Sequence, residues 1–582
     1  MEYVNLKING QQVKAPKGST VLEAARLANI KIPTLCFLKE INEIGACRVC
    51  IVELANGKIV TSCVYPAEEG MEVYTNTPRV LEYRKKTVQL LLSNHNRSCL
   101  SCVRSGKCEL QTLAHELGIE DEGFYDGVKT PSEIDTSAPH LVRDNSKCIL
   151  CRRCVAACEA TQSVSVIGAN NRGFDTCIGS AFEMGLAETA CINCGQCIAV
   201  CPTGALTEKD DTPAVFAALA DKSKYVVVQT APAVRAALGE EFGYPMGTDV
   251  EGQMAAALRR LGFNAVFDTD FAADLTIVEE AHELMERVEK GGKLPLITSC
   301  SPGWVRFCET YFPQFIPNLS SCKSPQTMQG AIIKSYYAKK MKIKPQDITV
   351  VSVMPCTAKK FEVTRPDECG TGYPDVDIVI TTRELARMIK KAGIDFANLP
   401  KEDFDDPLGE STGAGVIFGA TGGVMEAALR TAVCWITGKT PKAIEFKEVR
   451  GTQGIKEASY KVGKLEIKVA VASGLANARK LLEMVASGEK QYTFIEIMAC
   501  PGGCVNGGGQ PQVCGEIRNT VDIAKVRGKA LYKNDAAKKL RLSHKNPEVI
   551  KLYDEFLGEP GSKKAHKLLH TTYVKREINS AK

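Results

Sequence analysis

The residues best suited to do chemistry in this 582-residue chain are its 25 cysteines, about three times the usual share. Sixteen of them lie in the first 201 residues, and none follows until Cys300. Thiolates are soft ligands that suit iron and zinc, so this density predicts metal sites. The chain therefore divides into a metal-rich front and a longer back with a different task.

The first group has the spacing C-x10-C-x2-C-x12-C, formed by Cys36, Cys47, Cys50 and Cys63. Three of these thiolates share one loop and the fourth comes from a later strand, which is how four sulfurs surround two irons. Alternating strand-like runs and a helix over residues 21–29 precede them. The loop around Cys47 resembles that of plant-type 2Fe-2S ferredoxins, and a structural zinc site is the alternative.

The second group is one histidine and three cysteines: His95, Cys99, Cys102 and Cys108. From spacing alone, this set could hold either zinc or an iron–sulfur cluster. Its position after a 2Fe-2S domain resembles the arrangement in the large iron–sulfur subunit of NADH dehydrogenase and in iron hydrogenases. That resemblance implies a 4Fe-4S cluster.

Two further runs have C-x2-C-x2-C-x3-C spacing: Cys148, Cys151, Cys154 and Cys158, then Cys191, Cys194, Cys197 and Cys201. This is the bacterial two-cluster ferredoxin repeat, in which the fourth cysteine of each run ligates the other cluster. We therefore expect Cys201 at the first 4Fe-4S site and Cys158 at the second. Four accessory clusters in series predict an electron-transfer chain. Such a chain must end at a site of redox catalysis or pass its electrons to another protein.

Three cysteine loops in the back of the chain each follow an apolar stretch that predicts a strand, at residues 294–297, 348–353 and 492–495. The loops centre on Cys300, on Cys356, and on Cys500 with Cys504. Loops at the carboxyl ends of strands are where α/β layers present ligands. The glycines around Cys504 predict close approach of the backbone to a bulky cofactor.

Together these loops resemble the three motifs of FeFe-hydrogenases, and the order of domains is similar to that of large clostridial-type enzymes from near residue 2 onward. The resemblance implies an H-cluster: a 4Fe-4S cubane joined through a cysteine sulfur to a two-iron unit with CO, cyanide and azadithiolate ligands. It makes Cys356, Cys500 and Cys504 cubane ligands, and Cys504 the bridge.

Other roles carry over from the same resemblance. Lys359 would donate a hydrogen bond to cyanide, and the cofactor-binding residues would be Pro232, Ser324, Pro325, Gln326, Met354, Phe418 and Met498. Protons would pass along Cys300, Glu280, Ser320 and Glu283. Without the resemblance, the apolar residues would be interpreted as core packing. The glutamates, three apart on one helix face, would be interpreted as a solvated surface.

One departure concerns the fourth cubane ligand, because the family motif T-S-C-C-P-G-W has Ser301 in place of its second cysteine. Three explanations remain open: Cys300 shifts register to ligate, Ser301 ligates through oxygen, or Cys322 substitutes. We favour Cys322, since the extra thiol and the missing thiol lie in adjacent loops. A serine oxygen suits iron less well than a thiolate.

The sequence predicts an α+β multidomain chain whose catalytic domain is α/β. The expected segments are 1–80 (β-grasp 2Fe-2S domain), 81–139 (4Fe-4S domain with one His and three Cys ligands), 140–210 (two 4Fe-4S clusters), 211–520 (H-cluster domain) and 521–582 (helical, similar to a small subunit).

A net charge of +5 is too small and too mixed to indicate nucleic acid. No secretory leader and no run of about 20 apolar residues is evident, so we expect a reducing cytoplasm.

The expected function is reversible interconversion of H2 with protons and electrons. The expected partners are ferredoxin, flavin- and NAD-binding iron–sulfur subunits of an electron-bifurcating complex, and maturation proteins. No G-x-G-x-x-G follows a predicted strand, so NAD chemistry would belong to a partner. The alternatives are a non-catalytic electron-transfer subunit of an NADH dehydrogenase-like complex and a hydrogenase-like sensory or assembly protein.

Overall fold

The first domain is a five-stranded sheet with strand order β2-β1-β5-β3-β4. The computed structural model describes residues 2–120, 129, 133–440, 444–463 and 465–578. The strands are β1 (Tyr3–Ile8), β2 (Gln11–Pro16), β3 (Ile51–Leu54), β4 (Ile59–Thr61) and β5 (Glu72–Tyr74). Helix α1 (Val21–Leu27) packs on this sheet and begins with a capping box between Thr20 and Glu23. The predicted helix is confirmed, and it ends two residues earlier than expected.

Two helices form the second unit, α2 (Pro78–Ser93) and α3 (Glu109–Glu116). Helix α2 begins after Thr77, whose hydroxyl accepts from the Val80 N–H, and Pro78 occupies the first turn, where its missing N–H costs nothing. The buried Arg84 side chain donates to the carbonyls of Val49 and Ile51. This contact fixes the second unit against the first sheet.

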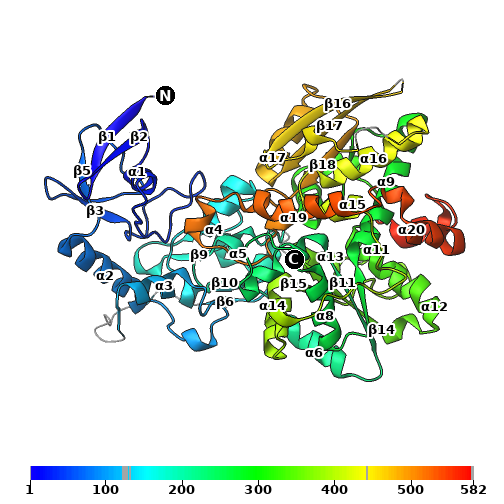
Figure 1. The fold of residues 1–582 in the computed structure, drawn as a ribbon, viewed down its shortest axis with the longest axis horizontal. Coiled ribbons are helices and arrows are strands. Elements are labelled where there is room, and N and C mark those ends of the chain that lie inside the picture. Colours follow the sequence, from blue (N-terminus) through cyan, green and yellow to red (C-terminus); the bar gives the residue numbers. More distant parts are fainter. Residues whose placement is uncertain (1, 121–128, 130–132, 441–443, 464, 579–582) are drawn as a thin grey trace.

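The third unit carries the two cysteine repeats on short elements. A three-stranded sheet with order β10-β7-β6 and a hairpin of β8 and β9 surround two short helices. The bounds are β6 (Ile134–Asp135), β7 (Leu141–Asp144), α4 (Arg153–Ala156), β8 (Gly168–Asn170), β9 (Cys177–Gly179), α5 (Gln196–Val200) and β10 (Leu206–Glu208). Figure 1 shows this unit between the N-terminal sheet and the large back part.

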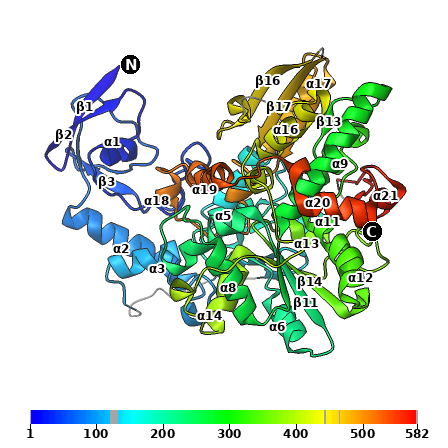
Figure 2. The same cartoon turned by 45° about the vertical axis from the view of Figure 1, so that its right-hand side comes forward.

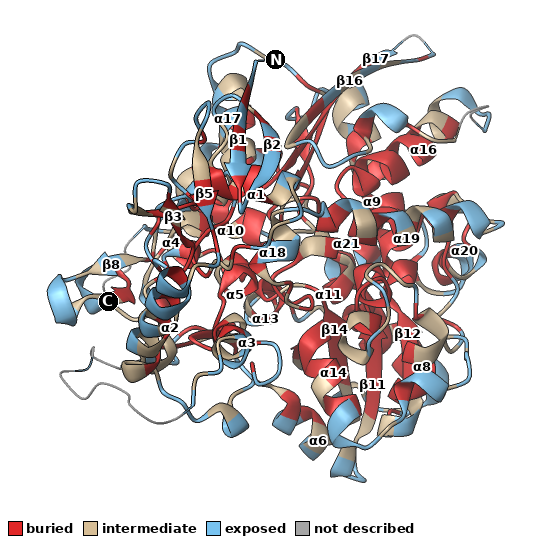
Figure 3. Ribbon diagram, turned by 60° about the vertical axis from the view of Figure 1, so that its left-hand side comes forward, coloured by how far each residue is buried: buried red, intermediate tan, exposed pale blue. Residues whose placement is uncertain are grey.

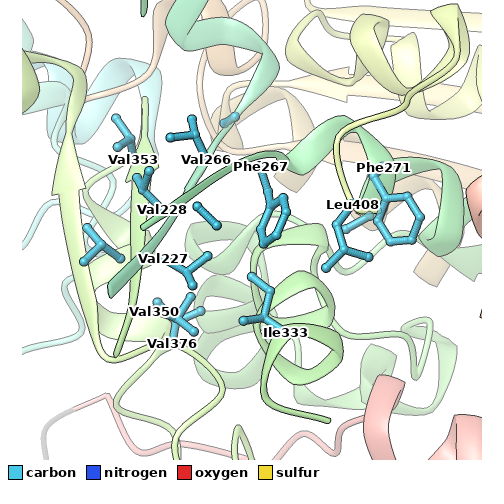
Figure 4. Packing of buried hydrophobic residues seen from close by; sticks show 14 of the residues in the cluster. Val227, Val228, Val266, Phe267, Phe271, Ile333, Val350, Val353, Val376 and Leu408 are labelled. Carbon is cyan, nitrogen blue, oxygen red and sulfur yellow. The ribbon is translucent and has the colours of Figure 1, made fainter. Parts of the chain in front are cut away.

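The back part contains a fully parallel sheet with order β12-β11-β14-β15. Its strands are β11 (Tyr225–Thr230), β12 (Ala265–Asp268), β14 (Ile348–Met354) and β15 (Ile378–Thr381). They read as nearly continuous apolar runs because helices cover both faces. The helices packed there include α8 (Glu251–Leu261), α9 (Thr269–Lys290), α11 (Pro325–Ile332) and α14 (Thr382–Lys391). Figure 4 shows Val228 and Val350 of the sheet near Phe267 and Ile333.

A second sheet has the order β13-β18-β17-β16, with only β16 antiparallel. Its strands are β13 (Leu296–Ile297), β16 (Ile455–Val462), β17 (Leu465–Ser473) and β18 (Phe494–Met498). Helices α10 (Pro302–Tyr311), α16 (Gly423–Thr437) and α17 (Leu475–Ala486) pack against it. All three strands predicted to precede the cysteine loops are therefore present.

The C-terminal segment wraps the back part rather than forming a core of its own. It consists of α19 (Ile523–Ala537), α20 (Pro547–Leu552) and α21 (Lys563–Leu569), and Figure 2 shows α20 and α21 beside α9 and α11. Asp535 of α19 binds the fully buried Arg430 of α16 at 2.8 Å. Near the end, the Thr571 N–H donates to the carbonyl of Ser321, which fixes the tail to the loop before α11.

Further short helices are α6 (Thr212–Ala220), α7 (Pro232–Arg235), α12 (Ala338–Met341), α13 (Ala358–Glu362), α15 (Gly413–Val416) and α18 (Gly515–Arg518). Burial is concentrated in the parallel sheet and its helices (Figure 3). Within the described ranges, no helix has both the length and the apolar character that crossing a bilayer requires. The predicted α+β multidomain fold is confirmed.

Candidate active site

The two sheets of the back part direct the carboxyl ends of four strands at one pocket. The loops after β11, β13, β14 and β18 supply Pro232, Cys300, Cys356 and Cys500 to its wall. Parallel strands place such loops at one edge of a sheet, so residues distant in sequence meet there. The sequence-predicted loops therefore converge.

The pocket combines cysteines with apolar walls. Its lining includes Cys300, Ser301, Cys356, Cys500 and Cys504, and most of the predicted cofactor residues: Pro232, Pro325, Gln326, Met354, Phe418 and Met498. Burial raises the pKa of Cys356 and raises that of Cys504 to about 12. Thiols in such surroundings become thiolates when they bind a metal. The donor set and the dry walls therefore fit an iron–sulfur cofactor.

The glycines around Cys504 line the pocket and also meet other backbone segments. A Cβ on Gly503, whose φ is +98°, would lie 2.6 Å from the Thr421 nitrogen, and one on Gly507 would lie 2.2 Å from the Pro355 oxygen. Three backbone segments meet at these glycines, so a side chain there would clash with protein on one side while the pocket lies on the other. The loop is thus locked by protein contacts.

Lys359 lines the pocket from helix α13 and is held by a carboxylate that sequence reasoning missed. Its Nζ donates to Glu362 Oε2 at 2.9 Å and to the Cys300 carbonyl at 3.2 Å. The same Glu362 oxygen accepts from Ser324 Oγ and Gln326 Nε2, each at 2.9 Å. Ser324 lies outside the pocket lining, a correction to its expected cofactor contact, because its hydroxyl at the start of α11 donates to Glu362. Glu362 could have been predicted from the sequence, because it follows Lys359 by three positions and so lies on the same face of a helix.

The predicted proton-path residues lie in order along α9 and the loop before α11. Burial, and then the nearby Glu283 carboxylate, raise the pKa of Glu280 to about 8. Burial, and then Glu280, raise the pKa of Cys300 well above its ordinary value. Ser320 interacts with the Glu280 carboxyl and donates to Glu283 Oε2 at 3.0 Å. Glu280 is thus buried between a pocket thiol and a partly exposed carboxylate, which suits proton transfer.

The structure corrects the preference for Cys322 as the fourth cubane ligand. Cys322 is outside the pocket, and its thiol faces Glu283 Oε2 at 3.9 Å, because backbone pairing with His570 directs it into the core. Ser301 lines the pocket and its Oγ accepts from the Ala499 N–H at 3.3 Å. Proximity in sequence to the missing thiol did not give the direction of the side chain.

The cysteine repeats of the third unit form two separate groups. One cavity is lined by Cys148, Cys151, Cys154 and Cys201, and another by Cys158, Cys191, Cys194 and Cys197. These are the exchanged sets expected from the ferredoxin repeat. Cys194 also lines the cysteine-lined pocket, and a Cβ on Gly508 would lie 2.3 Å from the Cys194 carbonyl oxygen. The second group therefore directly adjoins the pocket.

The 2Fe-2S cysteines also meet in one place. The Cys36 thiol contacts those of Cys47 and Cys63, and Cys63 also contacts Cys50. All four are buried. The loop before β3 and the turn after β4, where Cys63 lies, thus bring these sulfurs together as the spacing predicted.

The histidine group lies between these units. Among the described residues, the buried His95 Nδ1 has no hydrogen-bond partner, and burial lowers the pKa of His95 to about 4, with Lys147 adding to the effect. A neutral imidazole with a free nitrogen is the form that binds metal. Cys102 lies against Gly204 of the third unit, where an added Cβ would be 2.7 Å from its sulfur. The set is thus placed between the first and third units.

Buried ion pairs join the third unit to the pocket loop. Arg383 of α14 donates to Glu208 of β10 at 2.7 Å, and also to the carbonyls of Gly508 and Gln510. These residues carried no sequence signal, because the partners lie more than 100 positions apart. The contact fixes the glycine loop relative to the ferredoxin-like unit.

Successive cysteine groups that end at an apolar, cysteine-lined pocket define an iron–sulfur redox enzyme. Family models match the chain in the same order. They are a 2Fe-2S iron–sulfur cluster binding domain (2–78), the NADH-ubiquinone oxidoreductase-G iron–sulfur binding region (84–122), a 4Fe-4S dicluster domain (147–205), the C-terminal domain of the iron only hydrogenase large subunit (224–508) and the iron hydrogenase small subunit (521–576). The predicted domain boundaries themselves stay predictions.

Known proteins resemble the whole chain. It is 52% identical to the NADP-reducing hydrogenase subunit HndD of Solidesulfovibrio fructosivorans, over 99% of this chain and 100% of that one. It is 44% identical to iron hydrogenase 1 of Clostridium pasteurianum, over 98% and 99%. A solved structure of an [FeFe]-hydrogenase matches 63% of this chain and 99% of its own, at 44% identity and a TM-score of 0.56.

The chain belongs to the FeFe-hydrogenase family, and it is a hydrogenase. Relatives of full length at this identity decide against the non-catalytic electron-transfer subunit.

Proposed function

We propose that this hydrogenase interconverts H2 with two protons and two electrons at an H-cluster held by Cys356, Cys500 and Cys504. The observation that carries the proposal is the largely apolar pocket in which these cysteines meet Lys359 and Cys300. When bound, the H-cluster supplies the redox chemistry of H2, and the protein supplies position, hydrogen bonds and exclusion of water. For the fourth cubane position we propose Ser301, since it lines the pocket and leaves the neighbouring Cys300 thiol free to carry a proton.

The side chains divide the remaining work. Lys359, held by Glu362, presents a cation at the pocket wall, where it can donate to an anionic cofactor ligand. Cys300 and Glu280 hold and release a proton, and Ser320 connects Glu280 to Glu283. The methionines, prolines and Phe418 exclude water.

For the accessory sites we propose one 2Fe-2S cluster and three 4Fe-4S clusters, held by the four ligand groups described above. Support comes from the convergence of the cysteines in the 2Fe-2S group and in the two ferredoxin-repeat groups, and from the place of Cys194 in the pocket wall. Electrons would then travel between the front of the chain and the pocket through Cys194.

We further propose that the electrons reach ferredoxin and NAD- or NADP-linked partner subunits, as in electron-bifurcating complexes. The support is the relative named an NADP-reducing hydrogenase subunit and the absence of a G-x-G-x-x-G fingerprint from this sequence. Maturation proteins would deliver the two-iron unit. We place the enzyme in the cytoplasm, because all 25 cysteines are free of disulfides and thiols persist in a reducing compartment.

The test is the infrared spectrum of anaerobically matured protein in the CO and cyanide region, with hydrogen evolution from a reduced dye. Bands of both ligand types together with activity are expected, and their absence after full maturation would contradict the H-cluster. Purified single chain that reduces NAD with H2 would contradict the need for a nucleotide-binding partner.

A further inference from the structure

The loop of Ser320, Ser321 and Cys322 surrounds one oxygen of the Glu283 carboxylate. Glu283 Oε2 accepts from Ser320 Oγ at 3.0 Å, from the Ser321 N–H at 3.1 Å and from Ser321 Oγ at 3.3 Å. This oxygen therefore faces the protein interior. A proton on it has the Ser321 hydroxyl as a neighbour.

The other Glu283 oxygen is covered by a group that cannot take up a proton. Arg287 Nη2 binds Glu283 Oε1 at 2.5 Å, and the same guanidinium donates to the carbonyls of Pro317 and Leu319. A guanidinium stays protonated at every physiological pH, so it offers donors only. Direct release of a proton from Oε1 is hindered by this cap.

The C-terminal segment places a histidine on the far side of Ser321. Ser321 Oγ lies 2.8 Å from His570 Nδ1, and His570 Nε2 lies 3.1 Å from Glu279 Oε2. The backbone holds this geometry, because the Lys323 N–H donates to the Leu569 carbonyl and the Thr571 N–H to the Ser321 carbonyl, each at 2.8 Å. Ser321 thus stands between a carboxylate and an imidazole.

We propose that His570 is a relay residue that carries protons between Glu283 and the surface through the Ser321 hydroxyl. The proposal rests on the proposed path from Cys300 to Glu283. In the outward direction, the Glu283 O–H bond breaks as Ser321 Oγ takes that proton, and the Ser321 O–H bond breaks as His570 Nδ1 takes the other. Ser321 ends neutral, Glu283 becomes a carboxylate and His570 an imidazolium. The reverse sequence delivers a proton inward.

A carboxylate lies beside the His570 ring, 3.1 Å from Nε2. Although burial opposes it, hydrogen bonds from His570 and Tyr553 lower the pKa of Glu279, so this carboxylate stays charged beside the ring. The other titratable groups nearby are Glu283 and His282 of α9, Cys322, and His566 of α21. The exposed His566 ring packs at a tilt against His570 with centroids 4.1 Å apart, which places the relay at the protein surface.

The test uses the matured holoenzyme with His570→Gln and Ser321→Ala. Gln keeps hydrogen bonds but carries no proton, and Ala keeps the Ser321 N–H bond to Glu283. We expect hydrogen evolution to fall at least about tenfold, because positioned proton carriers contribute roughly 10²- to 10⁴-fold and part of the flow can still leave by Glu283. The pH profile of the rate should differ from that of the wild type, because the imidazole that carries the proton is gone. The CO and cyanide bands should stay unchanged.

His544→Gln is the matched control, because this histidine is also half-buried in the C-terminal segment but binds Thr431 at 3.1 Å, outside the relay. Added imidazole should restore part of the rate of His570→Ala and none in the control. An unchanged rate and pH profile in His570→Gln would overturn the relay, as would a loss without a pH change and without imidazole rescue. Wild-type protein without bands or activity would instead contradict the proposed function.

Discussion

The buried carboxyl Glu280 leads to a prediction in which activity and stability change in opposite directions. We consider Glu280→Gln, which keeps the size of the side chain and a hydrogen bond to Ser320. Glutamine cannot pass on a proton, so hydrogen evolution should fall about 10²- to 10³-fold. The same substitution should stabilise the fold at neutral pH.

The magnitude follows from the carboxyl pKa, which burial, and then Glu283, raise from 4.5 to about 8. Between these two values the unfolded chain releases the proton and the folded protein keeps it. Folding stability therefore falls as the pH rises from about 4.5 to about 8. With about 1.4 kcal/mol for each unit of pKa, Glu280 costs the fold about 3 kcal/mol at pH 7 and less than about 1 kcal/mol at pH 5. Glutamine removes this cost.

The assay is urea denaturation of wild type and Glu280→Gln at pH 5 and pH 7, followed by tryptophan fluorescence. Both tryptophans, Trp304 and Trp435, lie in the catalytic part, so the signal reports on that part of a multidomain chain. Glu286→Gln is the control, because it makes the same change on an exposed position of the same helix. A stability difference that does not grow between pH 5 and pH 7, or a less stable variant at pH 7, would refute the reasoning.

Three other substitutions test separate features. Cys322→Ala should leave the infrared bands and the electron paramagnetic resonance of the clusters unchanged, since its thiol lies outside the pocket; altered spectra would restore it as a ligand. Asp535→Asn should destabilise the catalytic part by about 1.5 to 3 kcal/mol, because Arg430 and Arg541 lose a charged partner while Glu426 still pairs with Arg430, and chemical denaturation measures this. Gly503→Ala should prevent cofactor loading, because its Cβ would meet the Thr421 backbone; a normal infrared spectrum would argue against that contact.

The sequence predicted much of the fold and most of the pocket, because the responsible signals are local. Cysteine spacing predicted which thiols meet in the first domain and in the ferredoxin-like unit. Apolar runs predicted the strands before Cys300, Cys356 and Cys500. The prediction for Cys322 failed because sequence spacing indicates where a residue lies but not where its side chain points. Cys322 is close to the pocket segment in the chain, but its backbone pairing turns the thiol toward Glu283.

Long-range partners were beyond the reach of sequence reasoning for a related reason. Ser321 and His570 are 249 positions apart, and neither belongs to a motif. Their meeting depends on how the tail wraps the catalytic part. Only the assembled fold brings such residues together. The contact between the Ser321 hydroxyl and the His570 imidazole suggests a relay only because Glu283 and Glu279 lie on either side of it.

The close approach of Gly508 to the carbonyl of Cys194 bears on how freely such enzymes can exchange their parts. Contacts between side chains at a domain boundary can be preserved by compensating substitutions. Two backbones in contact leave no room for any side chain at the glycine. A ferredoxin module transplanted from another chain would have to bring a matching glycine turn. Shuffling of electron-carrying modules should therefore be freer at the N-terminal sheet than at this junction, which must be inherited together with the catalytic loop.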